Sequence, residues 1–114
     1  MFNALPSAQL RSLADSFGLP LFVYDAATID RQIDTLKSSF DVPSLEIRYA
    51  CKALSTIGVL KQIYKHGCGI DTVSPGEMIM ALEAGVPASH ISFTPSGVLT
   101  EEYAFAIEKG VHVH

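Results

Sequence analysis

The sequence predicts an α/β fold, namely the N-terminal half of a (β/α)8 barrel that is incomplete in this chain of 114 residues. From residue 45 onward, short apolar segments alternate with amphipathic segments that end at glycine, which is typical of strands and helices around a parallel sheet. The segment 45–52 also carries Glu46, Arg48 and Lys52 on one face. A barrel interior tolerates such charges near its ends, whereas a central strand of a doubly wound sheet is apolar on both faces.

The N-terminal part predicts two helices joined by a strand. Apolar residues recur at helical spacing up to Phe17, and Gly18 supplies a helix end. The apolar run Pro20–Tyr24 then predicts a short strand. Asp25 is a good N-cap for the helix that follows, whose apolar stripe begins at Ile29.

The repeating part predicts three strand–helix units and a fourth strand. Ser74 can cap a helix that has Pro75 at its first position, and Glu77 three residues after the cap would complete a capping box. The expected strands are 45–51, 69–73, 90–94 and 111–114, and the expected helices are 56–66, 75–84 and 100–109. A complete barrel of this kind takes about 250 residues, so we expect the chain to be a piece of a longer protein.

Composition argues against several classes of function. The net charge of −4 without a basic cluster gives no reason to expect a nucleic acid partner. No apolar run approaches the roughly 20 residues of a membrane span, and the N-terminus lacks the pattern of a signal peptide, so a cytoplasmic protein is expected. Cys51 and Cys68 are expected to be reduced thiols. His112 and His114 have no third ligand nearby in the sequence, so no metal site is expected.

Lys52 and Asp71 are the candidate functional residues. Lys52 is expected on the inward face of the first barrel strand, at its C-terminal end, where catalytic residues of such barrels gather. An amine in a partly dry pocket can lose its proton and attack a carbonyl carbon. Asp71 is expected at the matching height on the next strand, where its carboxylate could hold Lys52 or a cationic cofactor. On these grounds alone, a surface lysine at a strand end is the commoner case.

Four segments in register add a resemblance to a known family. They resemble motifs of the fold-type III decarboxylases, which depend on pyridoxal phosphate and act on diaminopimelate, ornithine or arginine. The spacing of nineteen positions from Lys52 to Asp71 is also that of the family. The similarity runs in order from about Pro20 to the end of the chain, through Tyr49–Ser55, Gly69–Glu77, Ala84–Pro87 and Ile91–Gly97.

The resemblance implies a cofactor and a site. It implies pyridoxal phosphate bound covalently to Lys52, with Asp71 close to that lysine and to the ring, and Ala50 among the cofactor-binding residues. The sequence is most similar to the diaminopimelate decarboxylases, which make lysine from an amino-acid substrate. Two positions depart from the family, because Leu54 and Ser96 stand where asparagine is usual.

The resemblance also implies an organisation for the whole protein. Residues 1–24 would join a β-rich second domain completed by later sequence, and residues 25–114 would form part of the cofactor-binding barrel. The phosphate-binding glycines and the acidic partner of the pyridine nitrogen would lie later in the chain, so the fragment itself is expected to be inactive. The family further implies a homodimer with shared active sites.

Three alternatives stay open at this point. The substrate could be ornithine, arginine or carboxynorspermidine, because the loops that recognise it are not in this sequence. The protein could be a non-catalytic relative that binds pyridoxal phosphate without decarboxylating an amino acid. A related racemase would share the barrel and the lysine, but a tyrosine and glycines are expected after that lysine, where this chain has Ala53–Ile57.

Overall fold

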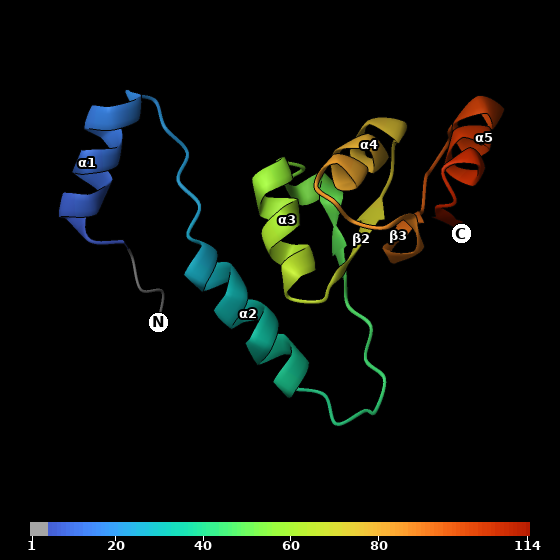
Figure 1. Ribbon diagram of the computed structural model, residues 1–114, viewed down its shortest axis with the longest axis horizontal. Helices are drawn as coiled ribbons and strands as arrows, with labels where there is room; N and C mark the ends of the chain where they lie inside the picture. The colour runs from blue at the N-terminus through green and yellow to red at the C-terminus, as the bar shows by residue number, and fades with distance from the viewer. Residues whose placement is uncertain (1–4) are drawn as a thin grey trace.

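The computed structural model describes residues 5–114 and contains one parallel sheet with helices against it (Figure 1). The four strands lie in the order β1-β2-β3-β4, and every neighbouring pair is parallel. The α/β prediction and its strand–helix alternation are therefore confirmed. The elements are α1 (Ser7–Phe17), α2 (Ala26–Ser38), β1 (Arg48–Ala50), the 3-10 helix η1 (Cys51–Ala53), α3 (Ile57–Lys65), β2 (Gly69–Thr72), α4 (Pro75–Glu83), the 3-10 helix η2 (Ala88–His90), β3 (Ile91–Phe93), α5 (Thr100–Glu108) and β4 (His112–Val113).

The sheet has two chemically different faces. The helix-covered face is apolar, because Ile70, Ile91 and Phe93 are fully buried in one core with side chains from α3, α4 and α5. Side chains alternate along a strand, so the residues between them form the opposite face. We call this the polar face, and the strand register places in one row across it Ala50, Asp71, Ser92 and His112.

Gly69 shows how closely β1, β2 and η2 approach at the start of the sheet. A Cβ atom on Gly69 would lie 2.7 Å from the carbonyl oxygen of His90 and 3.2 Å from Cγ of Arg48. The first of these is a backbone atom, which cannot move aside without shifting η2. A residue without a side chain is therefore required at position 69 for the three segments to pack.

Local sequence features explain where the helices begin and end. The side chain of Asp25 caps α2 by accepting a hydrogen bond from the N–H of Ala27, and Ser74 caps α4 by accepting one from Glu77. The expected capping box at α4 is modified, because the carboxylate of Glu77 accepts from the N–H of Val73, at 2.8 Å, and not from the cap residue. Glu77 thereby ties the end of β2 to the first turn of α4.

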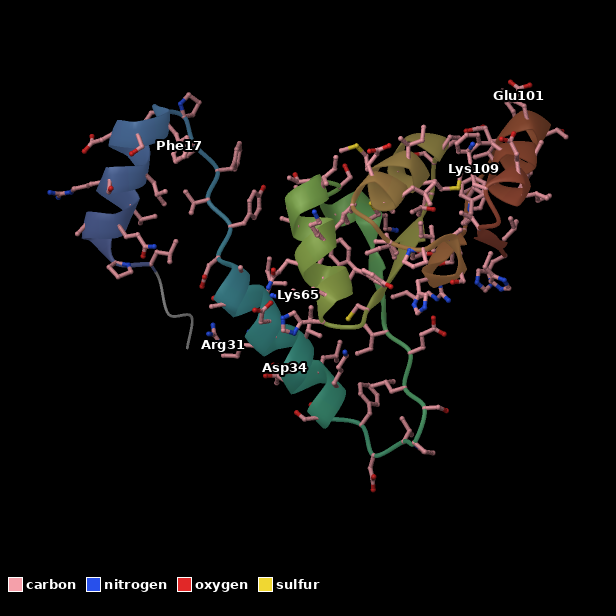
Figure 2. All side chains as sticks on the ribbon, viewed as in Figure 1. Phe17, Arg31, Asp34, Lys65, Glu101 and Lys109 are labelled. Atoms are coloured by element: carbon pink, nitrogen blue, oxygen red, sulfur yellow. The ribbon has the colours of Figure 1, made fainter. Side chains whose placement is uncertain are left out.

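A polar contact fastens α2 to the end of α3. Oδ1 of Asp30 accepts a hydrogen bond from Nε2 of Gln62 at 2.6 Å and lies 3.0 Å from Nε2 of His66. The ammonium of Lys37 donates to the backbone oxygen of His66. In Figure 2 the labelled side chains of Arg31 and Asp34 lie along α2. This contact, together with Ile29 and Ile33 against the core, holds α2 on the body of the domain.

Residues 5–25 form an arm that stands apart from the sheet. Helix α1 buries none of its residues, and Figure 1 shows it separated from the other helices. The radius of gyration is 16.5 Å, against about 13 Å for a compact chain of this length. Phe17 at the end of α1 is 73% exposed and Phe22 is 85% exposed (Figure 2 labels Phe17).

The predicted strand at Pro20–Tyr24 is wrong. This segment has no regular structure and no strand beside it in the described part of the chain. Residues with strand-forming side chains adopt a strand only where a neighbour supplies backbone hydrogen bonds. The apolar pattern suits a strand, but the partner strand that it needs is not among residues 5–114.

We expect core truncation on the helix-covered face to cost far more stability than the same truncation on the surface. Ile70→Ala removes a fully buried side chain and should destabilise the protein by about 2–5 kcal/mol. Ile107 is 69% exposed on α5, so Ile107→Ala is the matched control and should change stability little. Thermal unfolding of both variants checks this, and equal melting temperatures would contradict the described core.

Candidate functional site

Lys52 lies directly after β1, at the carboxyl end of the sheet. The sequence placed it on the strand itself, but β1 ends at Ala50 and the chain turns into η1. The N–H of Leu54 donates to the carbonyl oxygen of Cys51 at 3.0 Å and closes this turn. Lys52 is therefore exposed within a 3-10 turn. Its position at the C-terminal end of the first strand is as predicted.

Asp71 lies on β2 next to Ala50 of β1. It is the third of the four residues of β2, and its side chain is half-buried on the polar face. Ala50 is also half-buried, and its small side chain leaves space beside the carboxylate. Both residues therefore lie near the sheet end that Lys52 occupies, as the sequence predicted.

Two hydroxyl groups from β3 and the residue after it hold the carboxylate of Asp71. Ser92 Oγ donates to Asp71 Oδ1 at 2.7 Å, and Thr94 Oγ1 donates to the same oxygen at 2.8 Å. Sequence reasoning did not single out Ser92 or Thr94. The sequence did contain a signal for them. They are two residues apart in the predicted strand 90–94, and this spacing puts both hydroxyls on the same face of the sheet.

The described residues do not join Lys52 and Asp71 directly. The ion pairs within residues 5–114 involve other side chains, so the Lys52 ammonium has no carboxylate partner there. Oδ2 of Asp71 accepts none of the hydrogen bonds found in this part of the chain. The site thus offers an accessible amine and, on the neighbouring strand, a carboxylate with one oxygen already fixed.

Cys51 does not contribute its thiol to this site. Its side chain is fully buried in the core under the helices. Burial, with a smaller contribution from the charge of Glu77, raises the pKa of the Cys51 thiol to about 11. Burial also raises the pKa of Cys68, and both cysteines are free thiols. Neither is suited to act as a thiolate near neutral pH.

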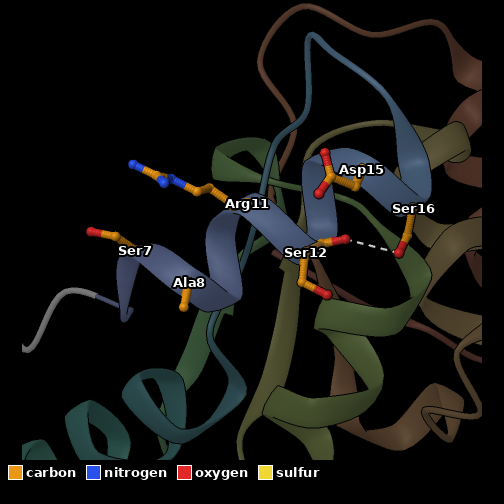
Figure 3. A pocket seen from close by; sticks show the side chains of 6 residues that line it. All are labelled: Ser7, Ala8, Arg11, Ser12, Asp15 and Ser16. Carbon is orange, nitrogen blue, oxygen red and sulfur yellow. Dashed lines mark hydrogen bonds between the residues drawn. The ribbon is translucent and has the colours of Figure 1, made fainter.

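Two of the hollows in the described structure can be compared with this site. One has a volume of about 540 Å³ and is lined by α1 alone, where Ser16 Oγ donates to the backbone oxygen of Ser12 (Figure 3). A single exposed helix cannot enclose a ligand, so this hollow is not a candidate site. A second, of about 470 Å³, is an apolar groove between α2, β1 and α3, and Ala50 lies in its lining.

No helix within residues 5–114 has both the length and the apolar character that crossing a membrane requires. The same part of the chain contains no group of three or more histidine, cysteine, aspartate or glutamate side chains placed to hold a metal ion. The rings of His112 and His114 lie edge to face, with centroids 4.5 Å apart.

The burial of Cys51 predicts a thiol that reacts slowly at mildly alkaline pH. At pH 8 the Cys51 thiol, with a pKa of about 11, should react with an alkylating reagent only when the protein opens, because burial excludes the reagent and keeps the thiolate scarce. Labelling followed by mass spectrometry should find Cys51 unmodified in the folded protein and modified in urea. Rapid labelling of the folded protein at Cys51 would contradict its place in the core.

Comparison with protein-family models finds one match over most of the chain. Residues 26–114 match the model described as "Pyridoxal-dependent decarboxylase, pyridoxal binding domain". The matched stretch begins at α2 and includes β1, Lys52, Asp71 and the rest of the sheet.

Curated relatives give the same family. The chain is 36% identical over 104 residues to the diaminopimelate decarboxylase of Methanothermobacter thermautotrophicus, covering 90% of this chain and 24% of that protein. It is 39% identical over 99 residues to the diaminopimelate decarboxylase of Haemophilus influenzae, covering 87% and 24%. The chain therefore spans about a quarter of the length of the curated relatives that it matches.

Solved structures agree on the fold. The diaminopimelate decarboxylase of Helicobacter pylori, solved in complex with L-lysine, superposes with a TM-score of 0.82 at 28% identity, over 90% of this chain and 26% of that one. The lysine/ornithine decarboxylase of Vibrio vulnificus, in complex with putrescine, superposes with a TM-score of 0.85 at 24% identity, over 95% and 30%. The sheet is accordingly part of a (β/α) barrel domain, as predicted.

Proposed function

This chain belongs to the pyridoxal-dependent decarboxylase family, and from that premise we propose that it is the lysine-bearing part of a diaminopimelate decarboxylase. Lys52 would bind pyridoxal phosphate, and the full-length enzyme would convert meso-diaminopimelate to L-lysine and carbon dioxide. The observation that carries the proposal is an exposed amine without an ionic partner in the described chain. It lies at the carboxyl end of a parallel sheet, directly after the strand that neighbours Asp71.

The residues present fit the part of pyridoxal phosphate that would react with a lysine, namely its aldehyde carbon and the adjoining ring. The Lys52 amine is accessible to an aldehyde carbon, and the neighbouring row of the polar face begins with a methyl group, at Ala50, followed by a carboxylate, at Asp71. A small residue leaves room for a planar ring, and a carboxylate stabilises positive charge that develops beside it. Donors for the phosphate group would have to come from sequence outside this chain.

Each residue has a defined task in the proposed reaction. The chemistry that pyridoxal phosphate would supply here, if bound, is an acceptor for the electron pair left on the α-carbon when the bond to the departing carboxylate breaks. Lys52 Nζ would hold the cofactor until the amino group of the substrate replaces it. Asp71 supplies negative charge near the nitrogen at Lys52. The apolar core beneath the sheet holds β1 and β2 in the register that pairs Ala50 with Asp71.

The test of the cofactor site is covalent trapping in the full-length protein. After addition of pyridoxal phosphate and reduction with borohydride, mass spectrometry should find the label on Lys52 and should find none in Lys52→Ala. Lys65, on the exposed side of α3 (Figure 2), gives the matched control Lys65→Ala, which should label like the wild type. A label that survives Lys52→Ala would show that the site lies elsewhere.

The same proteins, assayed with pyridoxal phosphate but without borohydride, identify the substrate. Wild-type and Lys65→Ala enzymes should release carbon dioxide from meso-diaminopimelate and leave lysine, whereas Lys52→Ala should release none. Greater turnover of ornithine, arginine or carboxynorspermidine would assign the protein to another branch of the family. Trapping on Lys52 without decarboxylation of any of these amino acids would identify a non-catalytic relative.

We further propose that residues 1–24 join a β-rich second domain in the full-length protein, which would be a cytoplasmic homodimer. The support is the arm, which contains Phe22 at 85% and Leu19 at 80% exposure in a segment without a partner strand among the described residues. Large apolar side chains in such numbers are normally covered by another surface.

This proposal predicts that Phe22 is buried in the full-length protein. Phe22→Ala should then lower its stability by about 3–5 kcal/mol, as for a core phenylalanine, and the melting temperature should fall clearly below that of the surface variant Ile107→Ala. If Phe22→Ala melts with the wild type, the arm stays exposed and residues 1–24 belong to no second domain.

A further inference from the structure

The carboxylate of Asp71 is oriented by the strand on its far side from Lys52. Asp71 and Ser92 are register partners on β2 and β3, and Ser92 is 1% exposed. Thr94 is two residues further along and half-buried. Both hydroxyls donate to Oδ1, at 2.7 and 2.8 Å, which are the usual distances of well-formed hydrogen bonds from a hydroxyl to an oxygen.

Two donors on one oxygen fix the direction of the whole group. A carboxylate that is free to turn exchanges its two oxygens, but each turn here would break both hydrogen bonds. A hydrogen bond to a charged group contributes more than one between neutral groups, so the observed orientation is strongly favoured. Oδ2, which accepts no hydrogen bond within residues 5–114, is left for a cationic group.

The backbone between the two strands keeps the hydroxyls opposite Asp71. The parallel ladder of backbone hydrogen bonds pairs Asp71 with Ser92 and Thr72 with Phe93. The N–H of Thr94 donates to the carbonyl oxygen of Thr72 at 2.9 Å. A shift of β3 along β2 by one residue would break these bonds and would also turn Ser92 toward the helices.

We propose that Ser92 and Thr94 are positioning residues for the decarboxylation proposed above, on which this inference rests. By holding Oδ1 of Asp71, they keep Oδ2 directed to the positively charged nitrogen that Lys52 provides when pyridoxal phosphate is bound. The protonated state of that nitrogen depends on a nearby negative charge. The two hydroxyls therefore act on the cofactor through Asp71 and do not touch it themselves.

The chain offers a matched pair of variants. Thr94→Val removes one hydroxyl that holds Asp71 and keeps the branched shape of the side chain. Thr72→Val removes a hydroxyl whose hydrogen bond goes to the backbone of the same seam and not to Asp71. If these hydroxyls served only to pack the strands together, the two changes should affect the bound cofactor similarly, because each removes one side-chain hydrogen bond across the same seam.

The measurement is the pH titration of the absorbance of pyridoxal phosphate bound to the full-length enzyme. A carboxylate beside the nitrogen raises the pH at which that nitrogen loses its proton, so a carboxylate that turns away lowers it. The midpoint should fall by about one pH unit in Thr94→Val and further in the double variant with Ser92→Ala. Thr72→Val should titrate like the wild type, and Thr94→Ser, which restores the hydroxyl, should do the same.

The outcomes separate this inference from the proposed function. A wild-type enzyme that takes up no cofactor on Lys52 would overturn the proposed function. A wild type that traps the cofactor on Lys52 and decarboxylates its substrate, with unchanged titration midpoints in Thr94→Val and the double variant, would overturn the positioning role alone. An equal shift in Thr72→Val and Thr94→Val would also overturn it, because the effect would then be one of general strand packing.

Discussion

The alternation of side chains along short parallel strands is the constraint on which the rest of the structure depends. Once Ile70, Ile91 and Phe93 are buried under the helices, the residues between them must face the other way. Together with the strand register, this places Asp71 and Ser92 side by side on the polar face. The hydrophobic core therefore builds the candidate site, since it determines which polar side chains become neighbours.

Most of the fold could be predicted because its boundaries are encoded locally. Asp25 and Ser74 cap the helices that were assigned to them, and glycines with positive φ follow α3 and α4 at Gly67 and Gly85. The segment Pro20–Tyr24 was predicted wrongly for the complementary reason. Its sequence favours a strand, but a strand also needs a partner, and no local pattern supplies one.

The site was predictable in part. Lys52 and Asp71 were identified by their motifs and by the expectation that functional side chains gather at the carboxyl ends of barrel strands. The turn of the chain into η1 was missed, because Cys51 and Lys52 continue the strand pattern while Leu54 closes a 3-10 turn. The contacts of Ser92 and Thr94 with Asp71 were not predicted either. Serine and threonine are common in strands, and only the register between β2 and β3 shows that these two lie next to a carboxylate.

The two halves of the candidate site differ in how firmly they are built. The seam between β2 and β3 is tied on both faces, by the Thr72 hydroxyl on one side and by the hydroxyls at Asp71 on the other. Strand β1 is three residues long, pairs with β2 alone among the described strands, and continues into a single 3-10 turn. Lys52 thus follows the less firmly tied strand, β1, and Asp71 lies on the strand that side-chain hydrogen bonds tie to β3. In the proposed reaction, the amine of Lys52 would leave the cofactor and return to it while the carboxylate of Asp71 kept its orientation.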